Sequence, residues 1–529
     1  MDRPAMVMGI ETEYSIYVRQ PPDMNYKLAV GSAGKTMLDC VRSSIEAMGE
    51  QVIITRNGLH PGVQHIANGA RFYLDSLHPE MSTSECQNPR DVVIWDAAGE
   101  RIVQTAAERA SKDLGFKVSI YKKLVDGHGH TWGCHDNFCI TPELFCRITK
   151  DEVRNIEQKT LATWLVVRQL LTGAGKIGTD NGGIRSAFQL SQRADFIIEF
   201  RNPHTMVNRP IINIRDIALA DEDDWRRLHL ICGDANLCQW STYLKMALTG
   251  LLLLLWQDGN LDKLPALPII VDADYARVMR FISRDPDMLG RYPIRIAVGR
   301  NRLGDKKYMS AAEILSQYTD ALAAYAQQRS WSSPAEADAY RQATQKAQWA
   351  AELLGNNRWR SLYGWLDWPT KRIVAEEYLR RKNKNWADVL TDEDLFRHVR
   401  TLGDINYTAL NPATSLFARL VKAGIIKTVV KNSEVVRAIL RPPPGRAAVR
   451  AMLISAYSIW VMTAHWNTLL FYEGAFRVQV LLNDPIGCEQ EELATALRVC
   501  PTPSDFVEYL RRFPIIGIFA KIELRKTDA

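Results

Sequence analysis

The segment "NGARFYLDSLHPE" (residues 68–80) predicts a β-strand that runs into a group of polar residues. Side chains alternate across a strand, so Arg71, Tyr73 and Asp75 share one face and the apolar residues between them share the other. A second acid, Glu80, follows closely. An arginine, a tyrosine and an aspartate at alternate positions are typical either of a solvated outer face or of a binding surface. The pattern alone leaves both interpretations open.

The segment "AMVMGIETEYSIYV" (residues 5–18) is rich in β-branched and aromatic residues and predicts another strand. Glu11 and Glu13 share one face of it, and Ile10 lies on the other. If the two strands are near one another, their carboxylates converge with Arg71 on one surface. Clustered carboxylates repel in a low-dielectric site, and Mg²⁺ relieves this because it takes oxygen ligands and brings phosphates with it. Arg71 suits a phosphate through bidentate hydrogen bonding.

The composition of the 529-residue chain is globular, with 47% hydrophobic and 24% charged residues, and the length predicts one large domain plus a smaller one. A net charge of +6 is mild for this length and does not indicate nucleic-acid binding. Nine cysteines without a CxxC pair indicate neither a disulfide framework nor a zinc site. The acidic start of the chain is unlike a signal peptide, and the apolar run 246–256 is too short to span a bilayer. We therefore expect a cytoplasmic protein without a membrane or nucleic-acid partner.

Strand patterns dominate the first half of the chain and helical patterns dominate later, without strict alternation, which predicts an α+β fold with an antiparallel sheet. A helix is expected over residues 91–114, and "RRLH" (226–229) is interpreted as a helix face. Three prolines in residues 439–448 exclude regular structure there, so the predicted domains are 1–438 and 439–529. The second is expected to contain a hairpin and to end in a helix.

Some other motifs have two interpretations. "TGAGKIG" (172–178) lacks P-loop spacing and favours a tight turn. "GHGHTWGCHDN" (127–137) holds three histidines without the spacing of a zinc site on a helix. Arg193 and Arg215 lie near strand ends, where they would either bind phosphate or form surface salt bridges.

An ordered set of motifs makes the chain resemble the Pup ligase and depupylase family: "GIETEY", "NGARFYLD", "HPE", "WDAAGER", "GCHDN", "LTGAGK", "QLSQRAD", "PIINIRD" and "RRLHLICGDANL". The resemblance is strong from about residue 7 to 260 and looser beyond. It implies a carboxylate–amine ligase fold related to glutamine synthetase. That fold has a large domain with a curved antiparallel sheet backed by helices, which binds Mg-ATP, and a small C-terminal α/β domain.

Residue roles follow from the resemblance by matching positions. They are magnesium ligands Glu11, Tyr73 and Glu80 with Glu13 close by, nucleotide contacts Arg71, Thr83 and Trp466, and Asp75 as the catalytic aspartate. The implied cofactors are ATP or ADP with Mg²⁺. The implied partners are Pup or a Pup-like modifier and its conjugated proteins, with a possible link to a bacterial proteasome pathway.

Two activities occur in the family that the chain resembles. The ligase forms an isopeptide bond through a glutamyl phosphate on the modifier, and the depupylase breaks that bond and deamidates a C-terminal glutamine. Only two residues separate Asp75 from His78, as in depupylases, whereas ligases tend to carry one more; "GIETEY" is the ligase form. We therefore expect a depupylase or Pup deamidase, with the ligase as the alternative.

The chain also departs from the family pattern. The family's "RDEPHAD" reads "RDIALAD" (215–221), so its glutamate and histidine become Ile217 and Leu219, and "HEN" reads "HDN" at residues 135–137. The lost histidine is expected near the metal and phosphate. A catalytically silent binder of modifier or nucleotide is therefore a further alternative.

Overall fold

The computed structural model describes residues 6–46, 55–57, 60–66, 68–150, 155–179, 186–259, 267–271, 274–285, 293–297 and 307–524. Its centre is a seven-stranded sheet whose neighbouring strands are all antiparallel. In sheet order the strands are β13 (Arg226–Leu230), β8 (Cys134–Ile140), β1 (Met8–Glu13), β6 (His78–Ser82), β5 (Arg71–Asp75), β4 (His60–His65) and β3 (Thr55–Asn57). The predicted α+β class with an antiparallel sheet is confirmed.

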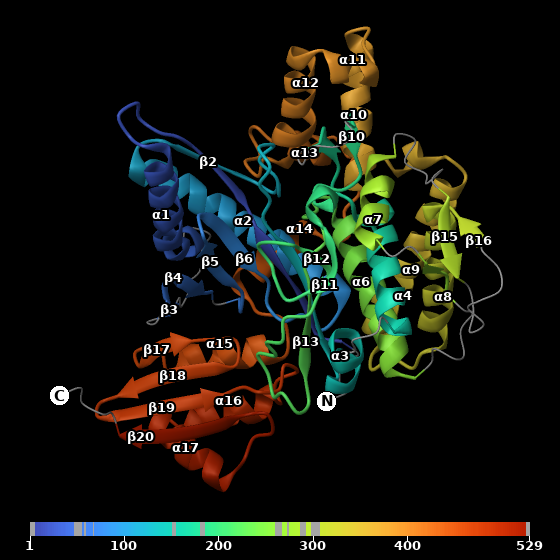
Figure 1. Ribbon diagram of the computed structural model, residues 1–529. Coiled ribbons are helices and arrows are strands. Elements are labelled where there is room, and N and C mark those ends of the chain that lie inside the picture. Colours follow the sequence, from blue (N-terminus) through green and yellow to red (C-terminus); the bar gives the residue numbers. More distant parts are fainter. Residues whose placement is uncertain are drawn as a thin grey trace.

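One face of this sheet is apolar and covered by helices (Figure 1). Ile10, Phe72 and Met81 are buried there. Helix α2 (Pro89–Leu114) packs so closely that a Cβ on Gly99 would lie 2.8 Å from Met81 Cγ. The Asn88 side chain caps its start and Gly115 ends it in the left-handed region, so the predicted helix over 91–114 is confirmed. The opposite face of the sheet is left for polar residues.

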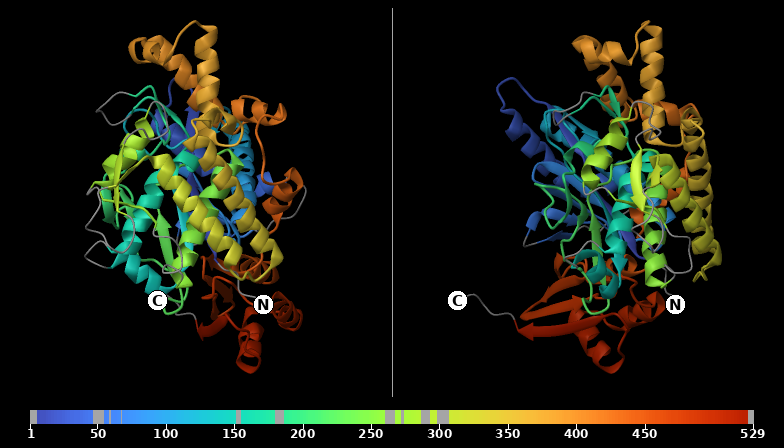
Figure 2. Two further views of the ribbon diagram at one scale, coloured as in Figure 1. Left: turned by 90° about the vertical axis from the view of Figure 1, so that its right-hand side faces the viewer. Right: turned by 45° about the vertical axis from the view of Figure 1, so that its right-hand side comes forward.

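A thick layer of helices covers the apolar side of the sheet. The long apolar run predicted to be a buried helix lies in α6 (Gln239–Gln257), whose residues from Ser241 to Trp256 are all buried. The other helices of the large domain are α1 (Tyr26–Glu46), α3 (Pro142–Thr149), α4 (Ile156–Val167), α5 (Gln169–Thr172), α7 (Tyr275–Arg284), α8 (Ala311–Gln328), α9 (Pro334–Gly355), α10 (Asp367–Arg381), α11 (Trp386–Thr391), α12 (Glu393–Arg400), α13 (Leu416–Lys422) and α14 (Asn432–Leu440). Helices α10 to α12 project from the end opposite the C-terminal part (Figures 1 and 2). None of the described helices combines the length and apolarity needed to cross a bilayer.

Small strand pairs fill the edges of the large domain. They are β2 (Ser15–Arg19) with β7 (Lys117–Tyr121), β9 (Lys176–Ile177) with β10 (Phe188–Gln189), and the parallel pair β11 (Glu199–Asn202) and β12 (Pro210–Asn213). A three-stranded sheet joins β14 (Ile269–Ile270), β15 (Ile294–Ala297) and β16 (Lys307–Met309).

The C-terminal segment forms a second hydrophobic core, from Val449 to Ile518, beside β3 (Figure 1). Its elements are α15 (Arg446–Ala456), β17 (Val461–Ala464), β18 (Thr468–Glu473), β19 (Phe476–Leu481), α16 (Gln490–Val499), α17 (Pro503–Arg512) and β20 (Phe519–Leu524). The predicted hairpin is β18–β19. The expected terminal helix is followed by β20, which pairs with β19, so that expectation is wrong for the last element. The domain boundary after residue 438 remains our proposal. The expectation that residues 439–448 lack regular structure is wrong at both ends, because α14 continues to Leu440 and α15 begins at Arg446.

The interpretation of residues 226–229 as a helix face is also wrong. These residues belong to β13, which pairs with β8 at the sheet edge. Leu228 and Leu230 point into the core, as strand alternation requires. The run is too short for helical periodicity to distinguish the two structures, and its pairing partner lies far back in the sequence.

Candidate functional site

The strand register brings the predicted acids together on the open face of the sheet. Glu13 of β1 lies opposite Glu80 of β6, and Glu80 lies opposite Tyr73 of β5. Two residues along, Glu11 and Arg71 both pair with the same residue of β6. Paired positions point to the same face of a sheet. The expectation that the two opening strands are near one another is therefore met through β6, which lies between them.

Glu13, Asp75 and Glu80 form the core of an oxygen cluster that also includes Tyr73. One carboxylate oxygen from each acid lies within 4.8 Å of the others, and Tyr73 OH donates to Glu80 Oε1. Burial, then the charge of Asp75, raises the pKa of Glu13 to about 7. Burial, then the charges of Glu11 and Glu13, holds the pKa of Glu80 well above its usual range. A hard divalent cation would relieve this repulsion, so the donor set fits Mg²⁺.

Asp75 stands at the accessible edge of this oxygen cluster. It is the last residue of β5 and is exposed, while Glu80 is buried. A two-residue turn follows, with Ser76 at φ 56°, and Asp75 pairs with His78 across it. The His78 ring stacks on Trp132 with 4.4 Å between ring centroids. A packed strand end therefore holds an exposed carboxylate against buried acids.

A second group, the histidine cluster, consists of Glu11, His135 and His229. His135 Nδ1 and His229 Nε2 lie 3.3 and 3.5 Å from Glu11 Oε2. His229 is 4% exposed, and neither of its ring nitrogens has a hydrogen-bond partner. Burial lowers the pKa of His135 to about 4, so its imidazole is neutral near pH 7 and able to bind a metal. One carboxylate and two imidazoles form a mixed nitrogen and oxygen donor set.

Glu11 is ionised more readily than its burial suggests. Burial raises its pKa, but contacts with His135 and His229 and the charge of Arg227 together hold it well below the usual range. Arg227 Nη1 lies 3.1 Å from Glu11 Oε1 and donates to Asn137 Oδ1 at 2.9 Å. Glu11 is thus an anion held between donors.

Sequence reasoning missed the histidine cluster. Spacing alone assigned no metal role to His135, and His229 was placed on a helix. Strand alternation in "RRLHL" would have put Arg227 and His229 on one face. Alternation also puts Asp136, the altered acid of "HDN", on the opposite face, where it is buried 2.8 Å from Arg168 and 3.0 Å from Lys245.

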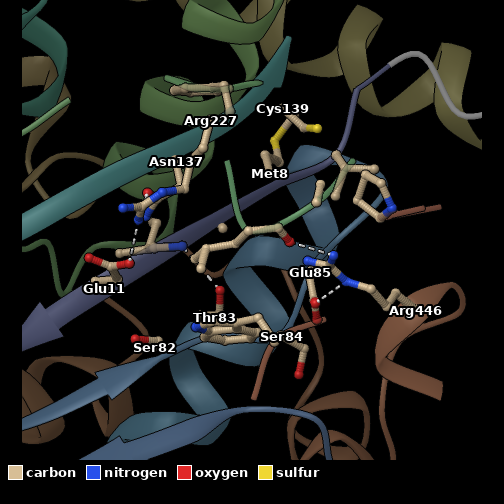
Figure 3. A pocket seen from close by; sticks show the side chains of 18 of the residues that line it. Met8, Glu11, Ser82, Thr83, Ser84, Glu85, Asn137, Cys139, Arg227 and Arg446 are labelled. Atoms are coloured by element: carbon tan, nitrogen blue, oxygen red, sulfur yellow. Dashed lines mark hydrogen bonds and ion pairs between the residues drawn. The ribbon is translucent and has the colours of Figure 1, made fainter. Parts of the chain in front are cut away.

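A pocket beside Glu11 is lined by two of the residues predicted to contact nucleotide, Thr83 and Trp466 (Figure 3). Its walls come from the start of β1, the segment after β6, β8 and the C-terminal part. Thr83 lies in its middle and accepts a hydrogen bond from the Ile10 N–H at 3.0 Å. Trp466 lines it, and Arg71 Cζ lies 5.5 Å from the Trp466 ring centroid. An aromatic ring beside an arginine and a carboxylate suits a base followed by phosphates and a metal.

Buried ion pairs connect the sheet to the C-terminal wall of this pocket. Glu85, directly after the Thr83 segment, accepts from Arg446 Nε and Arg450 Nη2, each at 2.8 Å. Burial raises the pKa of Glu85, but the charges of Arg450 and Arg446 bring it down to about 2. Arg450 Nη1 also donates to the Trp466 carbonyl at 2.8 Å. The position of Trp466 therefore depends on Glu85.

The remaining candidates lie in different places. Arg193 is buried, and its charge acts on Glu13. Arg215 is exposed after β12, and the described pocket beside Glu11 does not include it. Leu219, at the position of the family histidine, lines that pocket and its carbonyl accepts from Arg446 Nη1 at 2.7 Å. Ile217 is exposed.

A family model described as Pup-ligase protein matches residues 6–470. The "Depupylase" of Acidothermus cellulolyticus is 33% identical over 491 residues, covering 88% of this chain and 90% of the relative. The "Pup deamidase/depupylase" of Mycobacterium tuberculosis is 32% identical, covering 85% and 83%. The "Pup--protein ligase" of Acidimicrobium ferrooxidans is 31% identical, covering 81% and 88%.

A solved structure has the same fold. The ligase PafA, in its crystal complex with the prokaryotic ubiquitin-like protein Pup, superposes with a TM-score of 0.72 at 25% identity, covering 93% of this chain and 92% of that one. A second structure, PafA in complex with ADP, superposes with a TM-score of 0.66 at 23% identity.

Proposed function

Because the chain belongs to the Pup-ligase protein family, we propose that it is a depupylase-like amidohydrolase. It cleaves the isopeptide bond between Pup, or a Pup-like modifier, and a target lysine, and deamidates the modifier's C-terminal glutamine. Curated relatives with ligase names and with depupylase names match at about the same identity, so similarity alone does not separate the two activities.

The setting of Asp75 carries the proposal. The two-residue turn after β5 leaves this carboxylate exposed at the edge of the oxygen cluster. This is the turn that the "DSLHPE" spacing encodes, one residue shorter than in the ligases that the chain resembles. An exposed carboxylate at the edge of this cluster suits attack on an amide, because Asp75 is free to act as nucleophile or to activate water.

The nucleotide would lie in the pocket beside Glu11, with Trp466 and Thr83 near its base and Arg71 near its phosphates. Glu13, Tyr73 and Glu80 would hold Mg²⁺, and Glu11 with His135 and His229 would form a second metal site beside it. Mg²⁺ bound with the nucleotide would supply the positive charge that neutralises the clustered carboxylates. The protein's own residues hold the amide beside Asp75 and close the pocket from the C-terminal side.

The alternative activity is that of an ATP-dependent ligase. In that case Asp75 would take the proton from the attacking lysine, and the modifier would be activated as a glutamyl phosphate. The "GIETEY" motif of β1 favours this reading.

A conjugate assay separates these activities. The full chain is incubated with a Pup–protein conjugate and Mg-nucleotide, and the products are resolved by electrophoresis. Release of free Pup is expected, and loss of this release in Asp75→Asn with unchanged ADP binding assigns it to the site. ATP-dependent growth of conjugate from free Pup and protein would instead identify a ligase. Nucleotide and Pup binding without either reaction would identify a silent binder.

A further inference from the structure

Two arginines next to the oxygen cluster carry buried nitrogen atoms without partners. Arg193 is 1% exposed, and its Nε and Nη1 have no hydrogen-bond partner. Arg209 is half-buried, and its Nε is likewise unpartnered, although its Nη2 donates to the Thr131 carbonyl at 3.2 Å. Within the described part of the chain, neither guanidinium forms an ion pair. Buried charged groups are rarely left unsatisfied, because losing water without a replacement partner is costly.

Both guanidinium groups are held by fixed backbone. The Arg193 N–H donates to Ser191 Oγ at 3.1 Å and to Asp234 Oδ1 at 3.2 Å. The Arg209 carbonyl accepts from the Ile198 N–H at 2.9 Å, directly before β12. The fold therefore holds the two guanidinium groups near one another without a ligand, although two like charges repel one another. In line with that, burial and then the charge of Arg193 lower the pKa of Arg209 to about 10.

Glu13 does not satisfy the pair. The charges of Arg193 and Arg209 both act on Glu13, so the three residues share one region. Glu13 Oε1 is, however, already hydrogen-bonded by the Gly133 N–H at 2.7 Å. Glu13 therefore leaves Arg193 Nε and Nη1 and Arg209 Nε without an acceptor.

The position along β1 indicates which oxyanion. The nucleotide pocket follows β1 from Met8 to Glu11, and Arg71 and Arg227 supply positive charge at that end. Arg193 and Arg209 act at the Glu13 end, beside Asp75, where the amide reacts. Arg71 and Arg227 therefore lie at the nucleotide end of this face, and the arginine pair lies at the Asp75 end.

We propose that Arg193 and Arg209 bind the free carboxylate of the residue whose side-chain amide is cleaved. This rests on the proposed function, in which a C-terminal glutamine or glutamate of the modifier contributes its side-chain acyl group and keeps its own α-carboxylate. A planar guanidinium pairs with a carboxylate bidentately, so the pair fixes the reacting side chain from its backbone end. The terminal phosphoryl group of the nucleotide has the same oxyanion chemistry, and the experiment separates these two sources.

The test compares two probes on the full chain with Mg-nucleotide. One is Pup ending in glutamine with a free carboxylate, and the other is the same chain ending in glutamine α-carboxamide. Ammonia released from the side chain of each probe gives kcat and KM. For the unchanged protein, kcat/KM is expected to fall about 10- to 100-fold with the carboxamide, which is the range for losing a charge-assisted hydrogen bond.

Arg209→Gln removes the charge at the half-buried position, where folding is least affected. It is expected to lower kcat/KM on the carboxylate probe about 10- to 100-fold more than on the carboxamide probe, so that the preference for the carboxylate is lost. Arg209→Lys keeps the charge and recovers part of the discrimination. Arg512→Gln, an exposed arginine of α17, is the matched control and keeps the full preference.

Three results would overturn the inference. Equal hydrolysis of both probes by the unchanged protein would exclude a carboxylate site. A loss of ADP or ATP affinity in Arg209→Gln, with the probe preference kept, would assign the pair to the nucleotide phosphates. Failure of the unchanged protein to bind or hydrolyse either probe, while it still binds ADP, would reject the proposed function and this inference with it.

Discussion

Glu11 and Glu13 lie two residues apart on the same face of β1, yet their surroundings are opposite. Contacts with two histidines and the charge of Arg227 hold Glu11 ionised despite its burial. Glu13 faces Asp75 and Glu80, and its pKa rises to about 7. One strand therefore carries a mixed nitrogen and oxygen site next to an oxygen-only site. The difference arises from what lies across from each acid. Glu11 pairs with His135 of β8, with His229 of β13 beyond it, whereas Glu13 pairs with Glu80 of β6.

The largest effect is expected from a substitution that changes only Asp75, at the accessible edge of the oxygen cluster. Asp75→Asn keeps the size of the side chain but removes the negative charge and the nucleophile. Turnover of a Pup conjugate is expected to fall at least about 1000-fold, while ADP affinity by calorimetry stays within a few-fold. A variant that retains a tenth of the activity would remove Asp75 from the chemistry.

The second-largest expected effect is on the free energy of unfolding, at the link between the sheet and the C-terminal part. The folded-state pKa of Glu85 is about 2, below its ordinary value of 4.5, so its contribution is complete above pH 4.5 and is lost as the pH falls toward 2. The shift corresponds to about 3 kcal/mol of unfolding free energy. Urea unfolding at pH 6 and pH 3 measures the difference in unfolding free energy, here called the gap, between the unchanged protein and Glu85→Gln. The gap should narrow at pH 3, and a constant gap would contradict this assignment.

Two matched substitutions test whether the clusters bind different metals. His229→Gln should weaken Co²⁺ binding about 10- to 100-fold and spare Mg²⁺, because imidazole nitrogen suits transition metals. Glu80→Gln should do the reverse, because Mg²⁺ prefers oxygen ligands. Calorimetry measures both affinities, and the visible absorption of bound Co²⁺ reports its ligands. Equal losses of both metals in both variants would mean that the two clusters act as one site.

The smallest effect is expected from a substitution that restores the family histidine at residue 219. Leu219 lines the same pocket as Glu11, so Leu219→His adds a nitrogen donor near the histidine cluster. Co²⁺ affinity is expected to rise a few-fold, and Mg²⁺ affinity to change less. Leu219→Met is the control of similar volume. Unchanged Co²⁺ affinity would place residue 219 outside the metal's reach.

Strand alternation predicted much of the oxygen cluster, because Arg71, Tyr73 and Asp75 need only period two to share a face. It could not predict that β6 lies between β5 and β1, which sets Glu80 opposite Glu13. His229 was missed because a five-residue strand has no periodicity that excludes a helix.

Sequence reasoning also could not identify residues that pair across a long stretch of sequence. The bond between Glu85 and Arg450 joins residues 365 positions apart. No local pattern marks either residue as the other's partner. Trp466, by contrast, was located by family resemblance, and the structure brings it to Arg71.

The bond from Arg450 to the Trp466 carbonyl makes the pocket depend on a segment that is distant from the sheet in the sequence. The sheet face is complete with β13, but the aromatic wall of the pocket comes from a segment much later in the sequence. A nascent or truncated chain that stops before residue 466 carries its acids and histidines but lacks the ring beside Arg71. We expect such a fragment to leave nucleotide unbound, because one wall of the pocket is missing.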